Sequence, residues 1–242
     1  MIKTNTNIPE NVEKLMGFMK SEVPEITLNQ MEFMKQRKQR ETIEVNGISV
    51  DIQPYMFPPK SPYSYSTRVL LDNMSFQEGE RVLEIGTGCG ILSVYAAKQG
   101  AKVDGVDILP ECVEYSLRNA IQNGVFERTR FFYSNMFSNI DSKYDSIICN
   151  LPILEGELPE DDLRWLSLYD QGFAFHKELF KNGNKFGDRI LIAHADLRGK
   201  SDFKKLENLA ESYGWETGKI TSKEYSGQEW RNYEFLYGGN EK

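Results

Sequence analysis

The stretch Arg81-Val-Leu-Glu-Ile-Gly-Thr-Gly-Cys-Gly90 decides the fold of this chain. The run from Val82 to Ile85 is short and apolar, which is typical of a buried parallel strand. Three glycines follow at alternate positions, and the segment from Ile91 to Gln99 has the pattern of a helix. Strand, glycine turn and helix in this order are the context in which backbone amides bind a nucleotide. Glycine suits such a turn because it bends sharply and leaves the amides uncovered.

Two carboxylates accompany this turn. Glu84 lies at the end of the first strand, and Asp107 ends the next predicted strand, which begins at Lys102. Asp107 follows Gly86 at about the 20-residue spacing at which a carboxylate meets ribose hydroxyls. The dehydrogenase pattern GxGxxG fails, because Ile91 stands in place of its third glycine. An ordinary tight connection between strand and helix is the alternative interpretation.

The pattern E-x-G-x-G-x-G followed by Asp107 resembles the class I S-adenosylmethionine-dependent methyltransferases. This resemblance implies an α/β fold, a Rossmann-like sheet with helices on both faces, and S-adenosyl-L-methionine as cofactor. Asn135 and Met136 follow the predicted strand from Arg130 to Tyr133 at its carboxyl end, where ligands bind in open parallel sheets, so they are candidates to contact the adenine. The expected cofactor-binding residues are Glu84, Gly86, Thr87, Gly88, Gly90, Asp107, Ile108, Asn135, Met136 and Asn150.

A second chemical motif follows the predicted strand from Ser146 to Cys149. Asn150-Leu-Pro-Ile153 resembles the Asn-Pro-Pro-Tyr tetrad of amino-methylating enzymes. An asparagine side-chain oxygen and the next backbone carbonyl accept hydrogen bonds from an NH₂ group and aim its lone pair at the methyl donor. Positioning of this kind can carry much of the rate. Asn150 and Pro152 are therefore the predicted catalytic residues, with a strand cap and a strand end as the alternative.

The chain is most similar to the small-domain methyltransferases, including the release-factor glutamine methyltransferases. Phe57-Pro-Pro59, the glycine stretch and Asn150-Leu-Pro152 carry this likeness. The stretch Ser134–Ser138 followed by Asn150 resembles the ribosomal-RNA guanine methyltransferases equally well. Ile153 departs from the tetrad, because it replaces an aromatic ring whose stacking on a base is worth about 1–3 kcal/mol. This departure weakens the nucleobase interpretation.

The expected function is therefore methylation of an amide or amine nitrogen of a protein, peptide or small molecule. Methylation of an RNA base and a non-catalytic cofactor-binding module are the alternatives. The net charge of −7 and the acidic run 155–162 favour a cationic amine or guanidine acceptor over a phosphate backbone. The basic cluster Lys35–Arg40 is the contrary observation, since it could serve as an RNA arm.

The sequence predicts an appendage in residues 1–54 and a methyltransferase domain in residues 55–242. The appendage contains a helix opened by Pro9, a helix from Thr27 to Glu41 that carries the basic cluster, and a hairpin around Asn46-Gly47. In the domain, a helix from Leu109 to Asn123 is expected to bury Val113, Leu117 and Ile121. A further helix is expected from Leu163 to Phe180.

Composition excludes several other classes of protein. The three cysteines have spacings unlike a zinc site, and His176 and His194 are the only histidines, so no metal is expected. Buried free thiols fit a reducing compartment. No stretch resembles a signal peptide or is long enough to span a bilayer, so a soluble cytoplasmic protein is expected.

Overall fold

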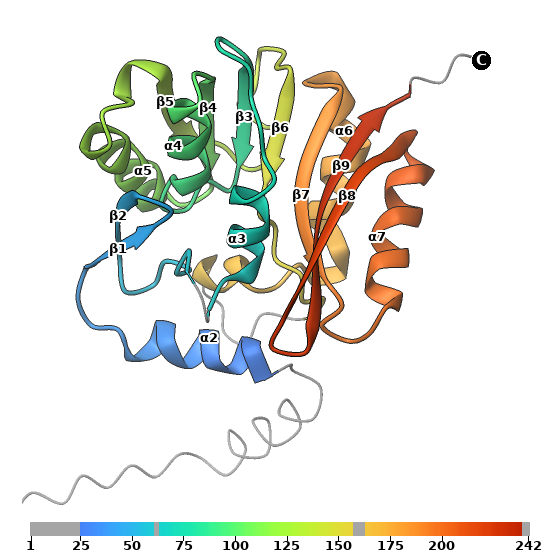
Figure 1. Ribbon diagram of the computed structural model, residues 1–242, viewed down its shortest axis with the longest axis horizontal. Coiled ribbons are helices and arrows are strands. Elements are labelled where there is room, and N and C mark those ends of the chain that lie inside the picture. Colours follow the sequence, from blue (N-terminus) through green and yellow to red (C-terminus); the bar gives the residue numbers. More distant parts are fainter. Residues whose placement is uncertain (1–24, 61–62, 157–162, 239–242) are drawn as a thin grey trace, which may run out of the picture.

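The computed structural model describes residues 25–60, 63–156 and 163–238, and it places a seven-stranded sheet between two layers of helices (Figure 1). The strand order is β5-β4-β3-β6-β7-β9-β8. Strands β5, β4, β3, β6 and β7 run parallel, and β9 pairs antiparallel with both β7 and β8. The predicted Rossmann-like α/β fold is confirmed.

The strands have the following bounds: β1 Glu41–Val45, β2 Ile48–Ile52, β3 Arg81–Ile85, β4 Lys102–Asp107, β5 Thr129–Tyr133, β6 Ser146–Cys149, β7 Arg189–Ala195, β8 Trp215–Tyr225 and β9 Gln228–Tyr237. The helices are α2 Glu25–Gln36, α3 Tyr65–Leu71, α4 Ile91–Lys98, α5 Pro110–Gln122, α6 Ala174–Asn182 and α7 Ser201–Ser212. Short 3-10 helices span Phe126–Arg128, Leu163–Ser167, Gln171–Phe173 and Gly183–Lys185.

Alternation along the central strands divides the core into two clusters. Val82 faces the cluster that contains the apolar residues of α3, α4 and α5, whereas Leu83 faces the cluster under α6 and α7. In the same way Ile148 belongs to the first cluster and Ile147 to the second. A strand covered on both faces is mostly apolar, which explains the apolar runs read from the sequence.

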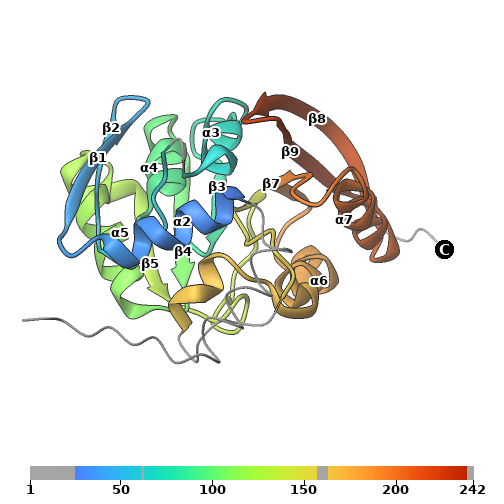
Figure 2. The ribbon, with the colours of Figure 1, turned by 90° about the horizontal axis from the view of Figure 1, so that it is seen from below.

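The amino-terminal elements pack against the same body. The hairpin β1–β2 lies on α5, where the Asn119 side chain donates to the Asp51 carbonyl at 2.9 Å and accepts from the Asp51 amide at 2.8 Å. Helix α2 crosses the carboxyl edge of the parallel strands (Figures 1 and 2). The division of the chain at residue 54 stays a prediction, and the helix predicted at Pro9 lies outside the described residues.

The expected buried face of α5 was wrong. Leu117 and Ile121 are 37% and 58% exposed, and the helix instead buries a face that includes Cys112, Tyr115 and Asn119. The hairpin and the glycine loop offer α5 polar backbone groups, so a face that includes Ser116 and Asn119 packs there in place of the larger aliphatic side chains. The sequence pattern could not anticipate these polar neighbours.

The helix predicted from Leu163 to Phe180 is also wrong as a single element. Gly172 and Phe173 adopt left-handed backbone conformations, with φ of 63° and 59°, and they separate the 3-10 turns from α6. Asp170 holds this break, because its side chain accepts hydrogen bonds from the amides of Phe175 and His176. Local helical periodicity gave no sign of this tertiary arrangement.

The basic cluster does not form a continuous helical face. Helix α2 ends at Gln36, so Arg37, Lys38 and Arg40 lie beyond it. Arg37 is half-buried and donates to the carbonyls of Gln53 and Met56, the second at 2.7 Å. This arginine therefore fixes the loop after the hairpin, which removes one charge from the proposed RNA arm.

Candidate active site

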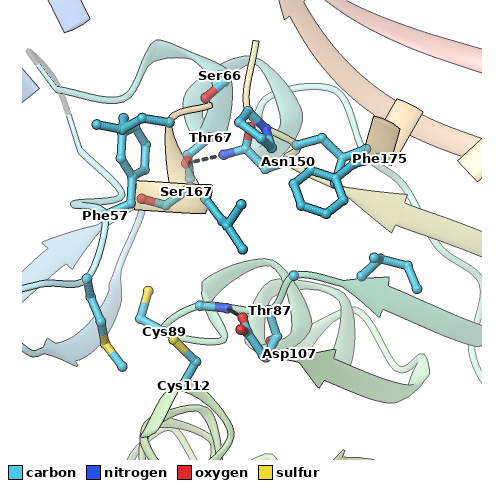
Figure 3. Close-up of a pocket in the computed structure, with 18 of the residues that line it drawn as sticks. Phe57, Ser66, Thr67, Thr87, Cys89, Asp107, Cys112, Asn150, Ser167 and Phe175 are labelled. Atoms are coloured by element: carbon cyan, nitrogen blue, oxygen red, sulfur yellow. Dashed lines mark hydrogen bonds between the residues drawn. The ribbon is translucent and has the colours of Figure 1, made fainter. Parts of the chain in front are cut away.

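A pocket opens at the carboxyl edge of β3, β4 and β6 (Figure 3). Helix α2, which crosses this edge (Figure 2), contributes Gln30 to the lining. We call one wall the glycine-loop side; it is formed by the last residues of β3 and β4 and by the segments that follow β3, β4 and β5. The other wall, the Asn150 side, is formed by the remaining lining residues. Asp107 and Asn150 lie on opposite walls. The sequence-predicted residues that line it are Glu84, Gly86, Thr87, Gly88, Asp107, Ile108, Asn135, Met136, Asn150 and Pro152.

The three glycines of the loop have two different structural roles. Gly86, Gly88 and Gly90 have φ of 71°, 55° and 78°, which L side chains adopt only with strain. A Cβ on Gly86 or Gly88 would meet nothing within 4 Å, so the space above them is open to a ligand. A Cβ on Gly90 would lie 2.9 Å from the Cβ of Ser116. Gly90 therefore allows α4 to approach α5, and it is absent from the pocket lining.

Glu84 binds the loop from beneath. Its Oε2 accepts hydrogen bonds from the Thr87 hydroxyl at 2.8 Å, from the Ser93 amide at 3.0 Å and from the Ser93 hydroxyl. Burial raises the pKa of Glu84 to about 7. The side chain thus ties the turn to the first residues of α4, and it shapes the loop from below.

Asp107 organises the other end of the same wall. Its Oδ2 accepts from the Gly88 amide at 2.9 Å, and its Oδ1 accepts from the Leu109 amide at 3.0 Å (Figure 3). Burial raises the pKa of Asp107 above its ordinary value. An ionised carboxylate has about four lone-pair sites, so both oxygens can still accept hydroxyl donors. This geometry fits the predicted contact with ribose.

The turn after β5 completes the glycine-loop side. Met136 has a φ of 49°, and its carbonyl accepts a hydrogen bond from the Ser134 hydroxyl at 2.8 Å. The Asn135 amide donates to the Ser138 hydroxyl at 3.1 Å. Because β5 pairs with β4, this turn lies next to Asp107, where the base of a nucleoside held by that carboxylate would extend.

Asn150 lies at the tip of β6 and is anchored by a residue that the sequence analysis missed. Its Nδ2 donates to the Thr67 hydroxyl oxygen at 3.2 Å (Figure 3). Leu151, Pro152 and Ile153 continue the wall. Thr67 stands far from Asn150 in the sequence, in a short helix with no motif of its own, so no local signal could have identified it.

The remainder of the Asn150 side comes from distant segments. Gln30 of α2, the loop 55–59, the segment 166–168, Phe175 and Trp230 line it. The Gln30 side chain donates to the Tyr63 carbonyl, which fastens α2 over the pocket. Met31 and Met34 of α2 pack on a third apolar cluster with Leu154, Trp165, Leu168 and Tyr169. Phe57 and Pro59, from the Phe57-Pro-Pro59 stretch that carries the family likeness, also line this wall.

The two walls differ in charge. Among the described lining residues, Glu84 and Asp107 are the ionisable carboxylates, and both belong to the glycine-loop side. Glu155, which opens the predicted acidic run, pairs with Lys205 and is absent from the lining; residues 157–162 lie outside the described part. The described lining of the Asn150 side is uncharged and mostly apolar.

Groups suited to other chemistries are buried or lie away from the pocket. Burial raises the pKa of the Cys89 thiol to about 12, so this pocket residue is not a thiolate nucleophile. His176 is fully buried with its Nδ1 2.7 Å from Asp170, outside the lining, and burial lowers its pKa. The described residues contain no cluster of side chains that could hold a metal ion. They also contain no helix with the length and apolarity to cross a bilayer.

Comparison with known proteins identifies the family of this chain. The family model described as the methyltransferase small domain matches residues 48–169. A protein of Methanocaldococcus jannaschii named "Putative protein N5-glutamine methyltransferase" is 38% identical over 69% of this chain and 86% of its own length. A ribosomal protein L11 methyltransferase of Dictyoglomus thermophilum is 45% identical over 31% of this chain, and the match spans only 25% of that relative.

Solved structures share the fold at low sequence identity. A methyltransferase from Pyrococcus furiosus aligns with a TM-score of 0.58 at 18% identity, over 88% of this chain and 96% of that one. A tRNA (uracil-54, C5)-methyltransferase of Pyrococcus abyssi, in complex with S-adenosyl-L-homocysteine, aligns with a TM-score of 0.57 at 16% identity, over 82% of this chain and 45% of that one. These similarities concern the architecture alone.

Proposed function

The chain belongs to the methyltransferase small-domain family and is an enzyme that uses S-adenosylmethionine. On this basis we propose that it methylates the side-chain amide nitrogen of a glutamine in a protein. When bound, the cofactor supplies a methyl group on a cationic sulfur; the new C–N bond replaces the C–S bond, the sulfur keeps the electron pair, and the nitrogen loses a proton to water.

The uncharged Asn150 side is the observation that carries this proposal. A cationic amine that entered it would lose water without meeting a carboxylate among the described residues of this side. A carboxamide is neutral, so it loses less hydration free energy when it enters this side of the pocket. This argument favours an amide over the cationic acceptor that the acidic run had suggested.

A carboxamide also matches the polar groups of this wall. Its NH₂ group can donate to the Asn150 Oδ1 and to the backbone carbonyl of Leu151, as in the tetrad that this segment resembles. Its carbonyl needs a donor. Trp230 lines the pocket, is 2% exposed, and its indole Nε1 has no hydrogen-bond partner among the described residues. A buried donor without a partner is costly, and we propose that the carbonyl of the bound amide reaches and satisfies it.

The relatives support a protein acceptor. The Methanocaldococcus jannaschii protein, of which this chain covers most of the length, carries glutamine in its printed name, and the ribosomal protein L11 methyltransferases carry a protein substrate in theirs. An RNA acceptor is less favoured, because Arg37 is engaged with loop carbonyls and Ile153 offers no stacking ring. A cytoplasmic location remains part of the proposal.

The direct test supplies methyl-labelled cofactor with a protein extract in one reaction and with total RNA in another. We expect the label in protein, and tandem mass spectrometry should place one methyl on a glutamine side chain. Asn150→Ala enzyme is the matched negative control. Label mainly in RNA, or on lysine or arginine side chains, would overturn the proposal.

A further inference from the structure

We infer that Thr67 is a positioning residue, which fixes the rotation of the Asn150 side-chain amide so that its oxygen faces the methyl acceptor. This inference rests on the proposed function, because it assigns Asn150 the task of holding an NH₂ group. The sequence motif contains Asn150 but nothing that says which way its amide points. The structure supplies that information through a hydrogen bond from a different element.

The need for such a residue follows from the symmetry of an amide. The oxygen and nitrogen of an asparagine side chain are nearly equal in size, and rotation about the last bond exchanges them. If the Nδ2 group of Asn150 faced the acceptor, two NH₂ groups would oppose each other. An acceptor nitrogen can be held only when the Asn150 Oδ1 is turned toward it.

Thr67 selects this rotation through its hydroxyl oxygen. That oxygen lies 3.2 Å from the Asn150 Nδ2 and 2.7 Å from the Ser64 hydroxyl, and both Ser64 and Thr67 are buried. When Thr67 donates its proton to Ser64, its lone pairs face Asn150 and accept only from the nitrogen end of the amide. The Asn150 Oδ1 is then turned away from Thr67.

The position of Thr67 is itself held by the start of α3. Ser64 caps this helix, and its hydroxyl oxygen accepts from the Thr67 amide at 3.2 Å and lies 3.3 Å from the Ser66 hydroxyl. Thr67 is 2% exposed, and its β-branched side chain has restricted rotation. The chain from Ser66 through Ser64 to Thr67 therefore offers Asn150 a rigid acceptor.

The test compares Thr67→Val, which keeps the shape and removes the hydroxyl, with Thr67→Ser, which keeps the hydroxyl. We expect Thr67→Val to lower kcat for a glutamine acceptor about tenfold and Thr67→Ser to retain most of it, with the affinity for S-adenosylhomocysteine within about twofold in both. In an Asn150→Ala background, Thr67→Val should have no further effect. The matched control is Thr129→Val, because Thr129 is partly buried and its hydroxyl donates to the nearby carbonyls of Val125 and Phe126.

A second measurement needs no acceptor and no turnover. Protein labelled with ¹⁵N in asparagine shows the side-chain NH₂ signals of Asn150, which are assigned by their loss in Asn150→Ala. Thr67→Val should shift these signals, and Thr67→Ser should leave them close to the wild-type positions. This arm separates the two proposals: shifted signals without any glutamine methylation would overturn the proposed acceptor and leave the hydrogen bond standing.

Three outcomes would overturn the inference. They are unchanged Asn150 signals in Thr67→Val, a loss of kcat that adds fully to that of Asn150→Ala, and a loss confined to cofactor affinity. The last result would place Thr67 among the cofactor contacts. If Thr67→Val fails to fold, Thr67→Ser and the wild-type spectrum still decide the matter, because a hydrogen-bonded NH₂ group exchanges its protons with water more slowly than a free one.

Discussion

The glycine-loop side of the pocket comes almost entirely from one stretch of chain, whereas the Asn150 side is assembled from segments of α2, α3, β9 and the loops between them. The first wall carries two carboxylates, Glu84 and Asp107, which shape backbone turns. The second wall is uncharged and mostly apolar, and Asn150 is hydrogen-bonded there to Thr67. The cofactor is the same molecule throughout the family, so a compact local motif is enough to bind it. An acceptor pocket needs a particular shape, which only converging segments provide.

The largest expected effect tests the open space over the glycine loop. Gly86→Val should abolish binding of S-adenosylhomocysteine in calorimetry, because the side chain enters the space that a Cβ at this position faces. Gly124→Val is the matched control, since Gly124 has the same φ of 71° and equally open surroundings at an exposed turn. Equal loss of binding in both variants would show that backbone strain alone is responsible.

The raised pKa of Glu84 predicts a pH dependence of the free energy of unfolding. The pKa of Glu84 is raised from 4.5 to about 7, so its contribution to stability is full below pH 4.5 and is lost as pH rises through 7. Between these limits the free energy of unfolding of wild type should fall by ~3 kcal/mol relative to Glu84→Gln. The difference between the two proteins cancels the titration of His176 and His194. Parallel curves in urea unfolding would contradict this assignment.

Asn150→Ala separates the two walls by function. The rate of methylation should fall by roughly 10² or more, because the acceptor nitrogen is no longer held, while cofactor affinity stays within a few-fold. Single-turnover kinetics and calorimetry measure the two quantities. A large loss of cofactor affinity would show that Asn150 binds the cofactor. Near-normal activity would show that Asn150 has a structural role and does not hold the acceptor.

Asp107→Ala makes the converse change. Cofactor affinity should weaken by about 1.5–3 kcal/mol, the range for a hydrogen bond to a charged group, while KM for the acceptor is unaffected at saturating cofactor. Calorimetry with S-adenosylhomocysteine checks the first expectation. Because Asp107 also accepts from the Gly88 amide, thermal unfolding of the variant must show a folded protein. Unchanged affinity in that folded protein would remove Asp107 from the cofactor site.

The smallest expected effect concerns Trp230. Trp230→Phe keeps an aromatic ring and removes the indole donor, so KM for a glutamine acceptor should rise by about fivefold, the effect of one neutral hydrogen bond of about 1 kcal/mol. The matched control is Trp165→Phe, which removes another buried indole donor without a partner among the described residues, from a residue outside the pocket lining. An equal rise in both variants would point to general loosening of the wall.

The amino-acid sequence by itself determined the glycine-loop side. Strand, turn and helix are consecutive there, and each rule that links residue to structure acts over a few positions. Glu84, Asp107 and the strand ending at Cys149 could therefore be placed in advance, and Asn150 could be placed at the tip of its strand. The close approach of Ser116 to Gly90 was the exception, because Ser116 lies on another helix.

Only the tertiary structure decided the Asn150 side. Gln30, Thr67 and Trp230 line one pocket because α2 crosses the edge of the sheet, α3 packs against β7 and β9, and β9 returns antiparallel to β7. The buried face of α5 and the break at Gly172 were misjudged for the same reason. Periodicity reports which side of an element is apolar, whereas the groups that face it, including polar backbone, are set by packing between segments that are distant in the chain.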